Sequence, residues 1–280
     1  MGSEIETRVE QAKAGNREAL EAVILHIQDR VFGLALRILG HPEDAEDAAQ
    51  EILIRIITHL ATFRGESSFT TWVYRISVNY LLSTRKRKPE RQYSSFEAFA
   101  EEIDRGLASR RPGNLSEAEI ALLAEEMMIS CTQGMLLCLD RYHRTAYILG
   151  EIFEVTGEQG GYILDISPAA FRKRLSRARE RLNDFMQHHC GLVNPANPCL
   201  CTRQITDKNE DGQIEKSRLL FTGYPCRARR DPVVMKGMQE LDELERVSGI
   251  FRSHPDYAAP STFLNHLKNL MDSGRFQLFD

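Results

Sequence analysis

Cysteine is scarce in this sequence, and so are long apolar runs. Six cysteines in 280 residues are too few for a scaffold built on disulfides. No run approaches the roughly 18 consecutive apolar residues that a membrane-spanning helix needs, so we expect no membrane attachment. Residues 1–10 are polar and acidic, unlike a secretory signal. We therefore expect a cytoplasmic protein with reduced thiols.

An excess of basic charge is also missing. The chain has 36 Lys and Arg against 40 Asp and Glu, a net charge of -4, which excludes a globally basic nucleic-acid binder but not a local basic surface. Residues 97–139 hold eight acids and three bases, whereas residues 171–182 hold six bases and one acid. A second basic run occupies residues 85–88. Two basic elements separated by an acidic segment indicate two contacts with a polyanion. The alternative is two solvated helix ends, which cations also suit.

Strand signals are weak, and apolar residues recur at helical spacing along most of the chain. The first long stripe consists of Leu20, Ile24, Ile27, Val31, Leu34 and Ile38. Pro42 opens the next helix, whose buried stripe is Ala45, Ala48, Ile52, Ile56 and Phe63. A third helix is predicted over residues 70–87, with Phe69, Val73, Ile76 and Tyr80 inward and Trp72, Arg75 and Asn79 outward. The pattern predicts an all-α fold.

Residues 156–182 have the pattern of a helix-turn-helix. A short helix and turn at 156–166 precede Ser167 and Pro168, which are typical of a helix cap and first turn. The second helix would bury Phe171, Leu175, Ala178 and Leu182 and turn its basic side chains outward. The adjacent glycines at 160–161 each cost about 1 kcal/mol relative to alanine, so we expect a short or loose first helix.

Two segments resemble region 2 of an extracytoplasmic-function sigma factor: DAEDAAQE at 44–51 and FRGESSFTTWVYRISVN at 63–79. A third, ISPAAFRKRLSRARERL at 166–182, resembles region 4 of the same family. The match covers about residues 14–186. It implies a region 2 domain at 1–89, an acidic linker at 90–115, a region 4 helix-turn-helix domain at 116–187, and a C-terminal extension at 188–280 that lies outside the match.

The resemblance implies a bacterial subunit that binds core RNA polymerase and promoter DNA. Core polymerase would be bound by Asp44, Asp47, Gln50, Glu51 and Arg55. The minus-ten element would be bound by Phe63, Arg64, Phe69, Trp72, Arg75 and Asn79, because unstacked bases need stacking partners and hydrogen bonds at their edges. The minus-thirty-five element would be bound by Ser167, Ala169, Arg172, Lys173, Ser176, Arg177 and Arg179.

Each of these interpretations has a plainer alternative. For Trp72 the alternative is a core residue, and for the acidic turn at 43–47 it is a match to the helix dipole alone. A stand-alone helix-turn-helix regulator would bind duplex DNA without polymerase. No catalytic constellation stands out, so we expect no enzyme.

The extension offers further hypotheses. His189, Cys190, Cys199 and Cys201 are weak candidates for a zinc site, a redox sensor or a metal enzyme, against free reduced cysteines. The segment at 207–218 imitates a calcium loop but ends in Arg218, which favours a polar turn. Two amphipathic helices are predicted, one through Met238, Leu241, Leu244 and Val247 and one through Phe263, Leu267 and Leu270. If the activity of the chain is regulated by a protein segment, that segment would be either a separate anti-sigma factor or this extension. The alternative for the extension is a small accessory bundle with only a stabilising role.

Overall fold

The computed structural model describes residues 2–85, 95–109, 115–205, 219–228 and 243–272, and within them the chain is mainly helical. The amino-terminal unit consists of α1 (Gly2–Lys13), α2 (Arg17–Leu39), α3 (Pro42–Thr58), η1 (Leu60–Thr62) and α4 (Phe69–Ser83). The second unit consists of α6 (Phe96–Ala108), α7 (Glu117–Cys138), α8 (Arg141–Tyr147), the π-helical turn η2 (Ile148–Ile152), α9 (Gly157–Leu164) and α10 (Pro168–His189). The all-α prediction is confirmed.

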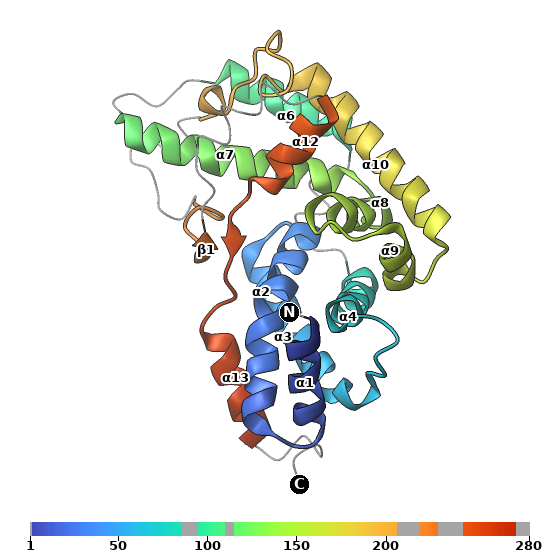
Figure 1. Cartoon of the computed structure of the whole chain (residues 1–280). Helices are drawn as coiled ribbons and strands as arrows, with labels where there is room; N and C mark the ends of the chain where they lie inside the picture. The colour runs from blue at the N-terminus through green and yellow to red at the C-terminus, as the bar shows by residue number, and fades with distance from the viewer. Residues whose placement is uncertain (1, 86–94, 110–114, 206–218, 229–242, 273–280) are drawn as a thin grey trace.

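The C-terminal extension adds short elements that run along both units (Figure 1). They are η3 (Cys201–Arg203), β1 (Cys226–Ala228), α12 (Glu243–Arg252), β2 (Asp256–Tyr257) and α13 (Thr262–Asp272). The strands β1 and β2 pair antiparallel, with Cys226 opposite Tyr257. Both predicted helices of the extension are present where the structure describes them. The calcium-like loop, Met238, Leu241 and residues 86–88 of the basic run lie outside the described residues.

Helix α2 is the centre of the first unit, and its whole predicted apolar stripe is buried. Asn16 caps its start by accepting a hydrogen bond from the Ala19 amide at 2.9 Å. Gly40 ends it with a φ of 75°, the left-handed conformation that glycine adopts without strain. A Cβ at Gly40 would lie 2.7 Å from Leu137, so glycine also lets the end of α2 approach the end of α7.

Two parts of the prediction for α4 need correction. The helix ends at Ser83 rather than near residue 87. Val73 and Phe69 are buried as expected, but Ile76 and Tyr80 are only half-buried, while Tyr74 and Val78 are buried instead. The reason is that α4 packs against α9 as well as against α2 and α3. Its buried residues therefore differ from those of a helix that is covered on one face only.

The predicted linker contains a helix. Ser95 caps α6 by accepting a hydrogen bond from the Ala98 amide at 3.2 Å, and Phe99 and Ile103 are buried. A Cβ at Gly134 of α7 would lie 2.6 Å from the Phe99 ring, so α6 is seated closely on α7. The lack of a clean apolar period in this segment predicts a linker without a helix. The helix forms nevertheless, because its contact with α7 needs only a few apolar residues.

Helix α7 begins with the capping box of Ser116 and Glu119, and hydrogen bonds from Ser116 lower the pKa of the Glu119 carboxyl. By length and composition alone, α7 is the one helix of the described chain that could cross a membrane. Half of its apolar 18-residue window is buried inside the protein, as in the core helix of a globular domain.

Candidate nucleic-acid interface

The face of α10 predicted to contact DNA is fully available. Ser167 caps the helix by accepting a hydrogen bond from the Ala170 amide at 3.2 Å, and Pro168 occupies the first turn. The predicted inner stripe of Phe171, Leu175, Ala178 and Leu182 is buried. The side chains predicted for the minus-thirty-five element are all exposed: Ser167, Ala169, Arg172, Lys173, Ser176, Arg177 and Arg179. One helix thus presents a continuous basic surface anchored by an apolar one.

Two of these cations already have protein partners. Arg172 pairs with Glu158 at 3.3 Å, and Arg179 donates from Nε to the Glu151 carboxylate at 2.6 Å. Among the residues that the structure describes, Lys173 and Arg177 form no ion pair. The surface therefore contains both cations that are ion-paired within the protein and cations that are not.

The two adjacent glycines make α9 closer-packed rather than looser. A Cβ at Gly160 would lie 2.4 Å from the Phe171 ring, and one at Gly161 would lie 2.8 Å from the Ile166 carbonyl oxygen. Thr156 and Gln159 form a capping box at the start of the helix. The absent side chains let the first helix lie directly on the second, which offsets their poor helix propensity.

Three aromatic rings gather where the loop before α4 meets the helix. Phe63 lies 5.4 Å from Phe69 and 5.5 Å from Trp72, and Phe69 stacks on Trp72 at 5.8 Å. Phe63 and Phe69 are buried, whereas Trp72 is half-buried and Arg64 is exposed. Lys13 donates to the Phe63 carbonyl at 2.5 Å and fixes this corner to α1. Trp72 is thus both a packing residue and the ring of the three that faces outward.

The polar residues of α4 face the second unit. Arg75 donates to the Tyr162 carbonyl at 3.0 Å, pairs with Asp165 at 3.0 Å and lies 4.6 Å above the Tyr162 ring. Asn79 is exposed. A cleft of about 370 Å³ lies mainly between α3 and α4 and is lined by Trp72, Arg75 and Asn79 among others, with Tyr162 contributed by α9. The surface predicted for the minus-ten element is therefore a shared boundary between the two units in this structure.

The residues predicted for core polymerase lie along the outer side of α3. Asp47, Glu51 and Arg55 are exposed, and Asp44 and Gln50 are half-buried. Arg55 lies 4.9 Å above the Tyr80 ring, which ties this stripe to α4. Partial burial, together with the neighbouring charges of Asp47 and Glu43, raises the pKa of the Glu46 carboxyl. The crowding of carboxylates at the start of α3 concentrates negative charge on one surface.

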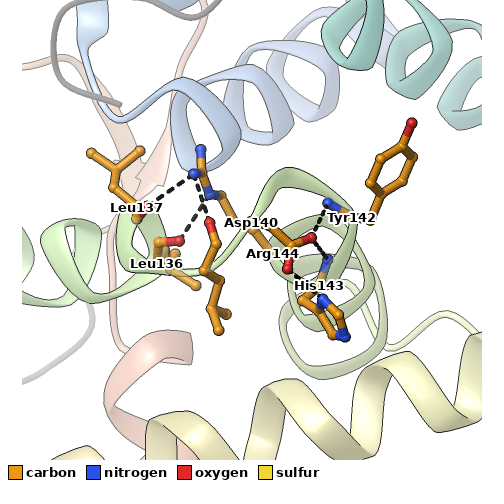
Figure 2. Close-up of polar contacts among 7 residues, drawn as sticks. Leu136, Leu137, Asp140, Tyr142, His143 and Arg144 are labelled. Carbon is orange, nitrogen blue, oxygen red and sulfur yellow. Dashed lines mark hydrogen bonds and ion pairs between the residues drawn. The ribbon is translucent and has the colours of Figure 1, made fainter. Parts of the chain in front are cut away.

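Two arginines of α8, which the sequence analysis missed, join the units. Arg144 is 2 % exposed. It donates to the carbonyls of Ile38 at 2.6 Å, Leu136 at 2.8 Å, Leu139 at 2.9 Å and Leu137 at 3.1 Å (Figure 2 shows those to α7). These carbonyls lie at the ends of α2 and α7, where four carbonyls per helix lack a helical partner. A cation there also matches the helix dipoles.

The second arginine, Arg141, caps α4 in the same way. It donates to the carbonyls of Leu81 at 3.0 Å and Thr84 at 2.5 Å. Asp140 caps the start of α8 by accepting from the amides of Tyr142 and His143 (Figure 2). Although burial opposes it, these hydrogen bonds and the one with the His143 ring lower the pKa of Asp140. The only feature of the sequence that indicates this role is the presence of Asp140 and Arg141 between two apolar helices.

Cys190, Cys199 and Cys201 come together at the end of α10, and Cys131 of α7, which the sequence analysis did not single out, lies within electrostatic range of all three. Burial raises the pKa of each of these thiols, that of Cys201 to about 12. His189 instead stacks on Phe185 at 4.6 Å. Within the described ranges, all cysteines are free and no three Cys, His, Asp or Glu side chains form a group that could hold a metal ion.

Comparison with known proteins places the chain in a family. The family model of sigma-70 region 2 matches residues 23–91. The chain is 31% identical over 179 residues to the ECF RNA polymerase sigma factor SigW of Bacillus subtilis, covering 64% of this chain and 94% of that protein. The chain belongs to the extracytoplasmic-function sigma factors. It is also 30% identical to the ECF RNA polymerase sigma-E factor of Escherichia coli K12 and 29% identical to the RNA polymerase sigma-H factor of Pseudomonas aeruginosa, each over 183 residues, 64% of this chain and 92% of the relative.

Membership of this family makes the chain a sigma factor of transcription initiation, and the resemblance inferred from the sequence is confirmed. Sigma factors bind core RNA polymerase and promoter DNA, so this reading is favoured over a stand-alone helix-turn-helix regulator. About a third of this chain lies outside the aligned part of these relatives.

Proposed function

We propose that this sigma factor contacts promoters at two separate surfaces while it is attached to core polymerase. The outer face of α10 would read the minus-thirty-five element through Arg172, Lys173 and Ser176, with Arg177 and Arg179 on phosphates. The α4 face around Trp72, Arg75 and Asn79 would receive the minus-ten element, and the α3 stripe would dock on core polymerase. The polymerase supplies the chemistry, and this chain catalyses no reaction itself. Its place of action would be the cytoplasm.

The exposed face of α10 is the observation that carries this proposal. Seven predicted DNA-binding residues emerge from a capped helix whose opposite side is fully buried. A helix of this kind fits the major groove, where arginine and lysine meet guanine edges and phosphates. Of the two regulators predicted from the sequence, the C-terminal extension contacts both units in the structure. An anti-sigma factor stays a prediction.

The double substitution Arg172→Ala and Lys173→Ala tests this assignment. Each good base contact contributes about 1–3 kcal/mol, so we expect promoter-dependent run-off transcription with core polymerase to fall roughly tenfold or more. Binding to core polymerase, measured by co-purification, should not change. Arg181→Ala is the matched control, because Arg181 is also exposed on α10 but lies two turns further along the helix. Equal transcription by the double variant and the control would overturn the minus-thirty-five assignment.

A further inference from the structure

We propose that residues 243–272 form an intramolecular clamp that holds the two promoter-binding units against each other and limits promoter use until it opens. The inference rests on the proposed function, because it assumes that the α4 face must be free to receive DNA. Three observations carry it: the segment is fastened to the second unit at one end, it is fastened to α2 at the other, and Arg75 of the α4 face is held by the second unit.

At its first end the clamp is fixed to the second unit. α12 packs on α10 and η2. The fully buried Phe251 meets Tyr147 edge to face at 5.2 Å. Arg252 donates to the Glu151 carbonyl at 2.5 Å and pairs with Glu154 at 3.5 Å. Aromatic burial combined with a charged hydrogen bond fixes this end of the segment to the second unit.

The middle of the clamp crosses the boundary between the units. His254, which is 1 % exposed, shares a 2.6 Å hydrogen bond with Thr132 of α7. The next residues reach α2, where Asp29 accepts from the Ala259 amide at 2.9 Å and pairs with Arg227 of β1. Over a few residues the chain thus passes from α7 to α2, as Figure 1 shows for the red segment between α12 and α13.

The far end of the clamp lies on α2. Phe263 is fully buried and meets Phe32 edge to face at 6.3 Å, and Tyr224 stacks on the same ring at 5.3 Å. Beyond it, Lys268 pairs with Glu21 at 2.8 Å, with side chains 40% and 35% exposed. Water competes at such a pair, so it contributes little and breaks easily. The ion pair is therefore the part of this end that a charge reversal can weaken, whereas the contact of Phe263 with Phe32 is buried.

One residue of the α4 face, Arg75, is occupied by the arrangement that the clamp spans. Both terminal nitrogens of Arg75 donate to the second unit, one to Tyr162 and one to Asp165, so a base edge would have to compete with these contacts. Separating α4 from α9 would free Arg75. The same movement would draw α2 away from α12, and the clamp connects these two helices. Opening of the clamp and exposure of the minus-ten surface are therefore coupled.

A charge exchange at the far end tests the clamp in the full chain. Lys268→Glu would face Glu21 with a like charge, and the double variant Lys268→Glu with Glu21→Lys would restore an opposite pair. Arg8→Glu is the control: it reverses a charge in an ion pair of α1 with Glu4, 3.4 Å long, that does not touch the extension. Fluorescent labels at the exposed positions Glu6 and Asp184, introduced by non-cysteine chemistry, would report the distance between the units by energy transfer.

We expect Lys268→Glu to lengthen the mean label distance and to raise promoter-dependent run-off transcription about two- to fivefold, the range that a partly exposed ion pair allows. The double variant should return both quantities toward those of the unmodified chain, and Arg8→Glu should leave both unchanged. An unchanged label distance in Lys268→Glu would overturn the clamp. A longer distance without more transcript would overturn its regulatory role. Absence of promoter-dependent transcript from every variant, the unmodified chain included, would instead refute the promoter-contact assignments on which the inference rests.

Discussion

Replacing Arg144 by methionine should lower the free energy of unfolding by about 3–5 kcal/mol. The guanidinium holds four carbonyls at the ends of two helices, and a buried carbonyl left without a donor costs about 1–3 kcal/mol. Methionine offsets part of this loss of free energy, because it fills much of the same space and removes the cost of burying a charge. Water can hydrogen-bond to some of the carbonyls that lose Arg144, so the expected loss stays below the sum of four unsatisfied carbonyls.

The assay is urea unfolding of the full chain followed by far-UV circular dichroism. Arg177→Met is the control, since Arg177 is exposed on α10 and its loss should change the free energy by no more than about 0.5 kcal/mol. Arg144→Lys should recover less than half of the loss, because one ammonium cannot reach carbonyls on two helices at once. A change below about 1 kcal/mol in Arg144→Met would refute the view that this side chain joins the units.

Two further predictions concern the packing of α9 and the buried histidine of the clamp. Gly160→Ala should lower the stability by about 1–3 kcal/mol, because its methyl group would overlap the Phe171 ring, whereas Gly157→Ala meets the flexible side chain of Arg172 and should be nearly neutral; equal melting temperatures would contradict this reasoning. Burial lowers the pKa of His254 to about 3, so the folded protein excludes a proton that the unfolded chain takes up below about pH 6.5. Stability should fall as the pH drops from about 6.5 toward 3, by at most about 1.4 kcal/mol per pH unit from this group, and His254→Gln should flatten that dependence in urea titrations; an unaltered slope would rule the histidine out.

Much of the fold can be predicted from the sequence wherever a helix buries one apolar face and exposes the other. The stripe of α2 and the buried and exposed sides of α10 were predicted residue by residue, because each helix buries a single broad stripe. The same reasoning misplaced Ile76 and Tyr80, because α4 has neighbours on more than one side. It also missed α6, in which Phe99 and Ile103 are the only buried apolar residues.

The remaining features depend on contacts between distant segments, which periodicity does not encode. Arg144 lies 106 residues from its partner Ile38, and Ala259 lies 230 residues from Asp29. The same is true of Cys131, which joins three cysteines from another part of the chain. Local patterns show which residues are polar in an apolar setting, but not which helix end or carboxylate will receive them.

The closed arrangement has a quantitative consequence for the sigma factor. A state that can bind DNA only after opening shows an affinity reduced by the fraction of molecules that are open. If one molecule in a hundred is open, the apparent affinity for the minus-ten element falls about a hundredfold, equivalent to about 2.7 kcal/mol of differential stabilisation. The contacts of Arg75 with Asp165 and of Lys268 with Glu21 are partly exposed, and each supplies only part of this difference. A polymerase surface that binds α3 and α10 in an open geometry would therefore have to overcome these contacts together with the buried hydrogen bonds by which Arg144 and Arg141 join the units. The basic face of α10 remains exposed for DNA before opening occurs.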